Sequence, residues 1–250
     1  MKLYAAAILA IMLPLLAHAS DARSVIATPK QRIETADYRL VGRIIRVDEN
    51  GARTNFGINL KAHWFPGVLR VLLDVTSPPS ARLRVLMEMR PDGQTTMKTI
   101  HPGDKSPAVL PFEQWTNSPF GPGFGYEDFL DPELYWPTQA VEDATYGARK
   151  CDLLTSVPGA ADRTHYSKVR TWLDHTIVFP VHADKTLKGS GTVKDFSFIG
   201  LRHEGGVWSA SQVEGKLRGN KGTTLLIVER GSTKAHLSMA DFSSENLVKF

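Results

Sequence analysis

The segment Tyr166–Ser232, "YSKVRTWLDHTIVFPVHADKTLKGSGTVKDFSFIGLRHEGGVWSASQVEGKLRGNKGTTLLIVERGS", decides the fold. Its runs of β-branched and aromatic residues are interrupted by the short stretches HT, GSG, EGG and GNKG. Interruptions rich in glycine and polar residues are typical of turns between antiparallel strands. We therefore expect an antiparallel meander that curls toward a barrel. Its strands are predicted at residues 166–174, 178–188, 192–203, 207–218 and 223–232.

The first half of the chain shows the same pattern. Strand-like runs end at the turn signals DENG, PG, PP and PDG, and "KCDLLTS" is typical of a further strand. A long amphipathic helix and an alternation of strands with helices are both missing from the pattern, which argues against a parallel α/β fold. The fold class predicted is therefore mainly β. The early strands are expected at residues 38–47, 56–65, 68–77 and 82–90.

The region between these two halves differs in composition. Residues 118–141 are rich in glycine, proline and aromatic side chains, with short helical turns predicted at 126–130 and 132–135. Helices this short are not stable alone, so we expect them to pack on the sheet. Near the N-terminus, Thr28 followed by Pro29 predicts a helix that begins there and runs to about Thr35.

The first residues, "MKLYAAAILAIMLPLLAHAS", have the three parts of a secretory signal. Lys2 supplies the positive region, residues 4–16 are apolar, and Ala17-His18-Ala19 is a small-residue cleavage site. The alternative, a membrane anchor, is disfavoured because the apolar run is short and contains a proline. We expect export, cleavage after Ala19, and a single domain over residues 20–250.

The overall composition excludes two classes of protein. The formal net charge is only +4 and the basic residues are spread out, so a nucleic-acid partner is not expected. Cys151 is the single cysteine, so an intramolecular disulfide cannot form and the chain is not a disulfide-stapled secreted domain. Hydrophobic residues make up 42% of the chain, enough for burial to stabilise a core.

Two histidines in "RTWLDHTIVFPVHADKTLKGSG" (170–191) raise the question of a metal or catalytic site. His175 lies next to Asp174 at a predicted turn, and His182 lies on the next strand with Asp184. Zinc sites need three or four ligands, and this spacing matches no metal motif. The favoured interpretation is the polar face of a hairpin. We therefore predict no metal and no cofactor.

Other candidate chemistry is equally weak. The acidic residues of 127–133 follow no calcium-loop pattern and are better explained as charges that complement the starts of short helices. A G-x-S-x-G nucleophile motif does not occur in the sequence. Cys151 resembles a buried core residue more than a nucleophile. We therefore expect a protein that is not an enzyme, with a histidine-dependent hydrolase as the least favoured alternative.

Aromatic residues in loops and on strands are the more informative feature. A curved sheet has an apolar concave face that must be covered by short helices, by a ligand, or by both. Packing statistics favour the simpler alternative, a filled core without a cavity. The sequence pattern alone leaves these possibilities open.

The second half of the chain, with "YEDFLDPELYWP" (126–137) and "ADFS" (240–243), resembles outer-membrane lipoprotein-sorting proteins of the LolA-like family. The resemblance runs from about Tyr38 to Phe242. It implies an unclosed antiparallel β-barrel in which short helices cover an apolar concave face. It also implies a periplasmic location. In the best-known members, the interior takes up the acyl chains of lipoproteins that cross the periplasm.

One position departs from the family's lipoprotein carrier. That carrier has an arginine directly before a proline on an early strand, whereas "WFPG" here has Phe65 before Pro66. The resemblance is therefore to the broader LolA-like branch, in which a lipid is as reasonable a cargo as a lipoprotein. Members of this branch often accompany membrane exporters of the RND type.

The resemblance implies a periplasmic, non-enzymatic carrier or binding protein for a lipid or lipoprotein acyl chain, acting in trafficking to the outer membrane. An inner-membrane exporter and an outer-membrane acceptor are the partners it suggests. The alternative is an accessory protein that docks on an RND-type exporter and binds no lipid. From residue type and pattern, the ligand-binding residues are predicted to be Trp64, Phe65, Leu72, Phe129, Trp136, Phe196, Phe198 and Trp208.

Overall fold

The structure is a computed structural model that describes residues 21–204 and 206–250; the predicted signal peptide lies outside the described residues. Its strands form one continuous antiparallel sheet in the order β6-β5-β4-β3-β2-β1-β13-β12-β11-β10-β9-β8-β7. The strands of the first half are β1 (Asp37–Val47), β2 (Arg53–Phe65), β3 (Val68–Ser77), β4 (Leu83–Met89), β5 (Thr95–Ile100) and β6 (Ala108–Val109). Those of the second half are β7 (Thr138–Tyr146), β8 (Arg149–Val157), β9 (Tyr166–Asp174), β10 (Pro180–Leu187), β11 (Val193–Glu204), β12 (Val207–Leu217) and β13 (Thr223–Ser232).

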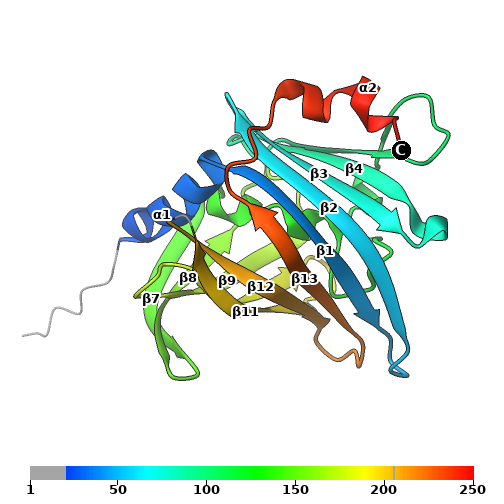
Figure 1. Ribbon diagram of the computed structural model, residues 1–250. Helices are drawn as coiled ribbons and strands as arrows, with labels where there is room; N and C mark the ends of the chain where they lie inside the picture. Colours follow the sequence, from blue (N-terminus) through cyan, green and yellow to red (C-terminus); the bar gives the residue numbers. More distant parts are fainter. Residues whose placement is uncertain (1–20, 205) are drawn as a thin grey trace, which may run out of the picture.

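The sheet curls strongly but does not close. Its two end strands, β6 and β7, are not paired with each other in the part of the chain described, and β3 and β8 lie on opposite sides of the molecule (Figure 1). Strands β1 and β13 join the two halves along the middle. The predicted mainly β fold, an unclosed antiparallel barrel, is confirmed.

Alternation of residue types decides which face of each strand points inward. On β2, the buried side chains of Phe56, Ile58 and Leu60 point to the concave face, while the intervening residues are more exposed. β3 and β4 continue this pattern, with Leu73 and Val85 fully buried in the same apolar core. The concave face is therefore apolar along the whole first half.

Residues 110–137, here called the cover segment, lie over the concave face. They contain three short 3-10 helices, η2 (Phe112–Gln114), η3 (Tyr126–Phe129) and η4 (Pro132–Leu134). The ring of Phe120 contacts that of Phe56 on β2 with centroids 5.4 Å apart, and Phe124 contacts Phe196 on β11 at 5.1 Å. The cover segment thus fills the concave face with its own aromatic side chains, as the sequence predicted for its short helices.

The first helix begins earlier than predicted. α1 (Ala22–Glu34) is capped by Asp21, whose carboxylate accepts a hydrogen bond from the backbone N–H of Arg23. Pro29 lies inside this helix instead of at its start, so the prediction of a helix beginning at Thr28 is wrong. Burial of Val25 and Ile26 against the second-half strands offsets the backbone hydrogen bond that the proline removes.

The C-terminal residues cover part of the outer face. After β13, η5 (Met239–Phe242) and α2 (Ser244–Leu247) pack on the convex side of β2–β5 (Figure 1). Phe242 meets Phe65 edge-on with ring centroids 5.6 Å apart, and Leu72 lies in the same cluster. In the described residues, no helix is long and apolar enough to cross a membrane.

Candidate ligand-binding site

Two lysines of the second half point inward, against expectation for such long charged side chains. On β10, Lys185 shares the concave face with Val181 and Ala183, and on β11 Lys194 shares it with Phe196. Lys185 is only 5% exposed and Lys194 only 3%. Charged groups this deeply buried must be paired, because an isolated buried charge is very costly.

The partners of these lysines are acidic residues of the cover segment. The Lys194 ammonium donates to Asp128 with Nζ–Oδ2 at 2.9 Å. Lys185 lies 3.4 Å from a Glu133 oxygen and 3.8 Å from Asp128. Asp128 also accepts hydrogen bonds from the Tyr166 hydroxyl and from a backbone N–H of the cover. We call Asp128, Glu133, Tyr166, Lys185 and Lys194 the buried ion cluster.

The pKa shifts follow from burial and from these pairings. Burial alone would raise the pKa of Asp128, but Lys194 and Lys185 outweigh burial and hold it below its usual range. Burial raises the pKa of Glu133 to about 7, and the charge of Lys185 offsets this only in part. One Glu133 oxygen, Oε2, has no hydrogen-bond partner among the described residues. Asp128 is therefore the firmly ionised acid of the cluster.

A second polar anchor lies beside this cluster. Glu127, only 2% exposed, accepts hydrogen bonds from the Thr164 hydroxyl and from the backbone N–H of His165. Its carboxylate also lies 3.1 Å from the Nδ1 atom of His165. The His165 ring in turn stacks on Phe112 with centroids 3.9 Å apart. The cover segment is thus attached to the second-half strands at two polar positions.

This network is not expected from the sequence pattern. The acidic residues of 127–133 are expected at the starts of short helices, whereas three of them, Glu127, Asp128 and Glu133, make the buried polar contacts above. The partners of Asp128 and Glu133, Lys185 and Lys194, lie more than 40 residues further along the chain. The available signal was the alternation of β10 and β11, which places both lysines among inward-facing apolar residues.

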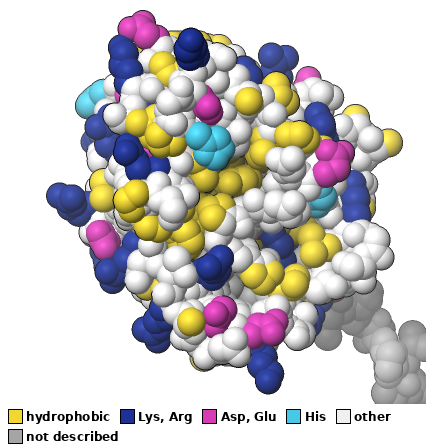
Figure 2. Space-filling view, turned by 90° about the vertical axis from the view of Figure 1, so that its right-hand side faces the viewer, with side chains coloured by type: hydrophobic (Ala, Val, Ile, Leu, Met, Phe, Trp, Pro, Cys, Tyr) yellow, Lys and Arg dark blue, Asp and Glu magenta, His cyan; other side chains and the backbone are white. Residues whose placement is uncertain are grey.

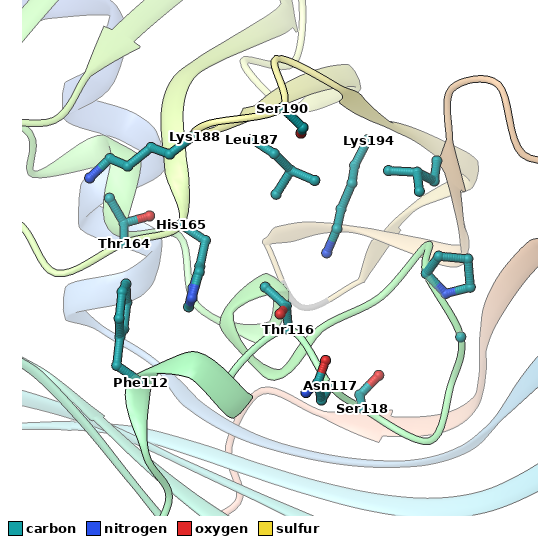
Figure 3. Close-up of a pocket in the computed structure, with 13 residues that line it drawn as sticks. Phe112, Thr116, Asn117, Ser118, Thr164, His165, Leu187, Lys188, Ser190 and Lys194 are labelled. Atoms are coloured by element: carbon teal, nitrogen blue, oxygen red, sulfur yellow. The ribbon is translucent and has the colours of Figure 1, made fainter.

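An open pocket of about 610 Å³ lies between the cover segment and the strands that carry these lysines (Figure 3). Its apolar lining consists of Phe112 and Pro122 from the cover, Leu187 from the end of β10, and Leu217 from the end of β12. Figure 2 shows a hollow on one face of the molecule with hydrophobic side chains at its bottom and charged side chains around it. A pocket of this size and lining is suited to a small ligand with an apolar part.

Polar side chains complete the lining of this pocket. Lys194 reaches toward its middle, and His165 points into the space above Phe112 (Figure 3). Hydroxyl and amide groups come from both sides, the cover and the strands. These are Thr116, Asn117, Ser118, Thr164 and Ser190.

The eight residues predicted to bind ligand lie in separate places. Four are on or against the concave face in the main core: Trp64, Phe129, Phe196 and Phe198. Phe65 and Leu72 lie on the opposite, convex face under the C-terminal residues. Among the described residues that line the 610 Å³ pocket, none belongs to this predicted set. Their role in binding stays a prediction.

The other two predicted tryptophans are also apart from one another. Trp136, 4% exposed, packs with Tyr166 and Val169, and Leu187 of the pocket lining contacts the same cluster. Trp208 faces the convex side and contacts the ring of His203 with centroids 4.9 Å apart. Trp136 thus shares an apolar cluster with one residue of the pocket lining, Leu187.

The two histidines that raised the metal question do not meet. His175 lies near Asp143 and Asp152, which face each other across β7 and β8, with His175 Nε2 3.2 Å from Asp152. His182 lies beside another cross-strand pair, Asp184 and Asp195, which Arg218 bridges. Side chains alternate along β10 as expected from the sequence, with His182 and Asp184 on the outer face.

A family model described only as an uncharacterized protein matches residues 69–249, most of the chain. The chain belongs to this family. A search of curated proteins found no match.

Solved structures show how this family member folds. A protein domain named for outer-membrane lipoprotein sorting, from Vibrio parahaemolyticus, has a TM-score of 0.79 and 17% identity, covering 91% of this chain and 98% of that one. A DUF1329 family protein from Desulfovibrio piger has a TM-score of 0.80 and 14% identity, with 90% and 98% covered. A LolA superfamily protein from Nitrosomonas europaea has a TM-score of 0.68 and 13% identity, with 91% and 99% covered. At these identities the similarity establishes the fold, and the predicted LolA-like resemblance is confirmed.

The ion cluster gives a first prediction, on stability. Replacing Lys194 by Met leaves Asp128 buried with less compensation, so we expect a loss of about 3 kcal/mol or more in the free energy of unfolding. The double variant Lys194→Met/Asp128→Asn should recover part of that loss. Lys216→Met, which removes an exposed pair with Glu214, is the control and should cost less than about 1 kcal/mol. Equal urea midpoints for Lys194→Met and Lys216→Met would contradict the assignment.

The raised pKa of Glu133 gives a second prediction, on pH. A carboxyl whose folded pKa is about 7 stabilises the fold below its ordinary value of 4.5, and this contribution is lost as the pH rises toward 7. Glu133→Gln removes the titration. Wild-type protein should therefore lose stability relative to Glu133→Gln between these two pH values, measured by urea unfolding at several pH values. A stability difference that does not change with pH would refute the shifted pKa.

Proposed function

We propose that this protein is a non-enzymatic carrier or binding protein for a molecule with an acyl chain. The observation that carries the proposal is the pocket of about 610 Å³ at the junction of the cover segment and the second-half strands. Its volume lies within the range of about 300–1,000 Å³ that is common for small-molecule sites. The LolA-like fold supports the same class of function.

Burial of hydrocarbon would supply the binding free energy. Each CH₂ group removed from water contributes about 0.8 kcal/mol. The apolar lining from Phe112, Pro122, Leu187 and Leu217 gives such a chain surfaces to contact on both sides of the pocket. Binding of this kind needs no covalent chemistry, so release to an acceptor would depend on relative affinity alone.

The deeper concave face is already occupied by the cover segment. Phe120 and Phe124 contact strand residues across it, and Tyr135 stacks on Trp64 with centroids 5.9 Å apart. A chain longer than the pocket would enter the interior only after these aromatic residues move. Trp64, Phe129, Phe196 and Phe198 would then become contacts of the chain, which is how their predicted role fits the proposal.

We further propose that this exchange takes place in the periplasm. The signal-like N-terminal sequence and the resemblance to outer-membrane lipoprotein-sorting proteins support this location. One structural neighbour is itself named for lipoprotein sorting. A lipid or a lipoprotein acyl chain would be the cargo, with an inner-membrane exporter as donor and an outer-membrane site as acceptor.

The second candidate is an accessory protein that docks on an exporter and carries no lipid. The filled concave face favours this second function, because side chains of the protein itself occupy the interior and cargo would be confined to open pockets. The two functions differ in whether the purified protein holds an acyl-chain molecule.

Native mass spectrometry of the protein from a Gram-negative periplasm, followed by lipid extraction, tests the carrier function. We expect an adduct with the mass of an acyl-chain molecule. Leu217→Asp places a charge in the pocket lining and should reduce the bound fraction about tenfold, a change of ~1.4 kcal/mol. Ile199→Asp is the matched control because Ile199 is 44% exposed and lies outside the pocket lining. A clean apo mass, or equal adducts in both variants, would favour the accessory function.

A further inference from the structure

The ionisable side chains that line the pocket are all cationic or imidazole groups. They are His165, Lys188 and Lys194, and among the described residues of the lining none is acidic. Lys188 is exposed at the end of β10, while Lys194 is buried and reaches in from β11 (Figure 3). Lys194 therefore reaches the pocket from its inner wall, while Lys188 lies at the rim with its ammonium group directed away from Lys194 (Figure 3).

The carboxylates that pair with these groups lie behind them. Asp128 holds Lys194 at 2.9 Å, and the side chain of Asp128 is fully buried. Glu127 contacts the Nδ1 atom of His165 and is also buried. Both pairs are thus oriented with the nitrogen group at the pocket wall and the carboxylate inside the protein. Such an orientation presents the nitrogen groups, and not the carboxylates, to a ligand.

Neutral donors surround the same space. The hydroxyl of Ser190 and the amide of Asn117 line the pocket beside the charged groups. Hydrogen bonds in which one partner is ionised are stronger than neutral ones, so these donors favour an anionic oxygen. The apolar lining residues adjoin these polar groups, so one ligand can contact both kinds of surface.

We propose that the pocket binds an amphiphile whose head group is an anionic carboxylate or phosphate. The head group lies beside Lys194 and His165, with the charge of Lys188 at the rim, and the hydrocarbon chain lies against Phe112, Leu187 and Leu217. This inference rests on the proposed carrier function and names its class of ligand.

Binding of this head group also acts on the cover segment. Lys194 is shared between the pocket and Asp128, so an anionic oxygen near its ammonium group competes with the cover's carboxylate. Asp128 keeps Lys185, the Tyr166 hydroxyl and the Gly125 N–H as partners when Lys194 turns to the ligand. This competition therefore weakens the attachment of the cover segment to β11, while Asp128 keeps its other partners.

The test compares ligands that share one chain and differ in charge. Isothermal titration of the delipidated full-length protein uses myristoyl lysophosphatidate, the monoacylglycerol with the same chain, and inorganic phosphate. We expect the lysophosphatidate to bind at least tenfold more tightly than the monoacylglycerol. The preference should shrink at high salt, because part of the site is exposed.

Variants assign the preference to the pocket. Lys188→Gln should weaken lysophosphatidate binding severalfold and leave monoacylglycerol binding unchanged. Lys168→Gln is the matched control, since Lys168 is an exposed lysine on the neighbouring strand β9 outside the pocket lining. The double variant Lys194→Gln/Asp128→Asn removes both charges of the buried pair and should also weaken only lysophosphatidate binding, with its fold checked by circular dichroism.

The outcomes separate the two proposals. Equal affinity for lysophosphatidate and monoacylglycerol would overturn the anionic head group and leave the carrier function standing. Failure of both amphiphiles to bind would overturn both proposals. Phosphate binding as tight as that of the lysophosphatidate would show a free-anion site and overturn the amphiphile. Equal weakening of lysophosphatidate binding by Lys188→Gln and Lys168→Gln would show that the head group does not bind in this pocket.

Discussion

The ion pair between Asp128 and Lys194 joins the cover segment to the sheet, and the remaining structure depends on this connection. Asp128 belongs to the cover segment and Lys194 to β11, and the pair is buried where water does not compete for either charge. Apolar contacts such as Phe124 against Phe196 hold the same two parts together but specify position less strictly. A charge pair in the interior has few alternative arrangements of acceptable energy, since any displacement leaves a buried charge with fewer partners.

This constraint explains why the concave face is filled and the pocket lies at its edge. Once Asp128 and Glu133 are fixed on Lys194 and Lys185, the aromatic residues between η2 and η4 have a defined place over the sheet. Phe120 and Phe129 then pack on each other and on the first-half strands. The space that remains is beyond the cover, where β10 and β12 end and Leu187 and Leu217 are left partly exposed.

Local pattern predicted the strands but not the contacts between distant elements. The alternation in Tyr166–Ser232 and the glycine-rich turns placed β9–β13 within a few residues of their observed bounds. β5 was missed because four of the six residues in "TTMKTI" are polar. The start of α1 was predicted too late because the proline inside the helix obscured Asp21 as its cap. The faces of Phe65 and Leu72 could not be predicted because each follows another large apolar residue, Trp64 and Val71, so alternation does not distinguish the two faces there. The pairing of Asp128 with Lys194 joins residues far apart in the chain, so it becomes visible only once the sheet is folded.

In the proposed function, the same long-range pairing links how a ligand is held to how it is released. In a carrier without an energy source, the affinity for cargo must be high enough to capture it and low enough to surrender it to an acceptor. In the proposed carrier, a pocket whose inner wall carries a lysine already engaged by Asp128 would meet both conditions, because the ligand would compete with an internal carboxylate that returns when the ligand leaves. The buried carboxylate would thus limit the net gain from an anionic head group. The hydrocarbon contacts with Phe112, Leu187 and Leu217 would then supply most of the favourable free energy, and an acceptor with a more extensive apolar surface would withdraw the chain.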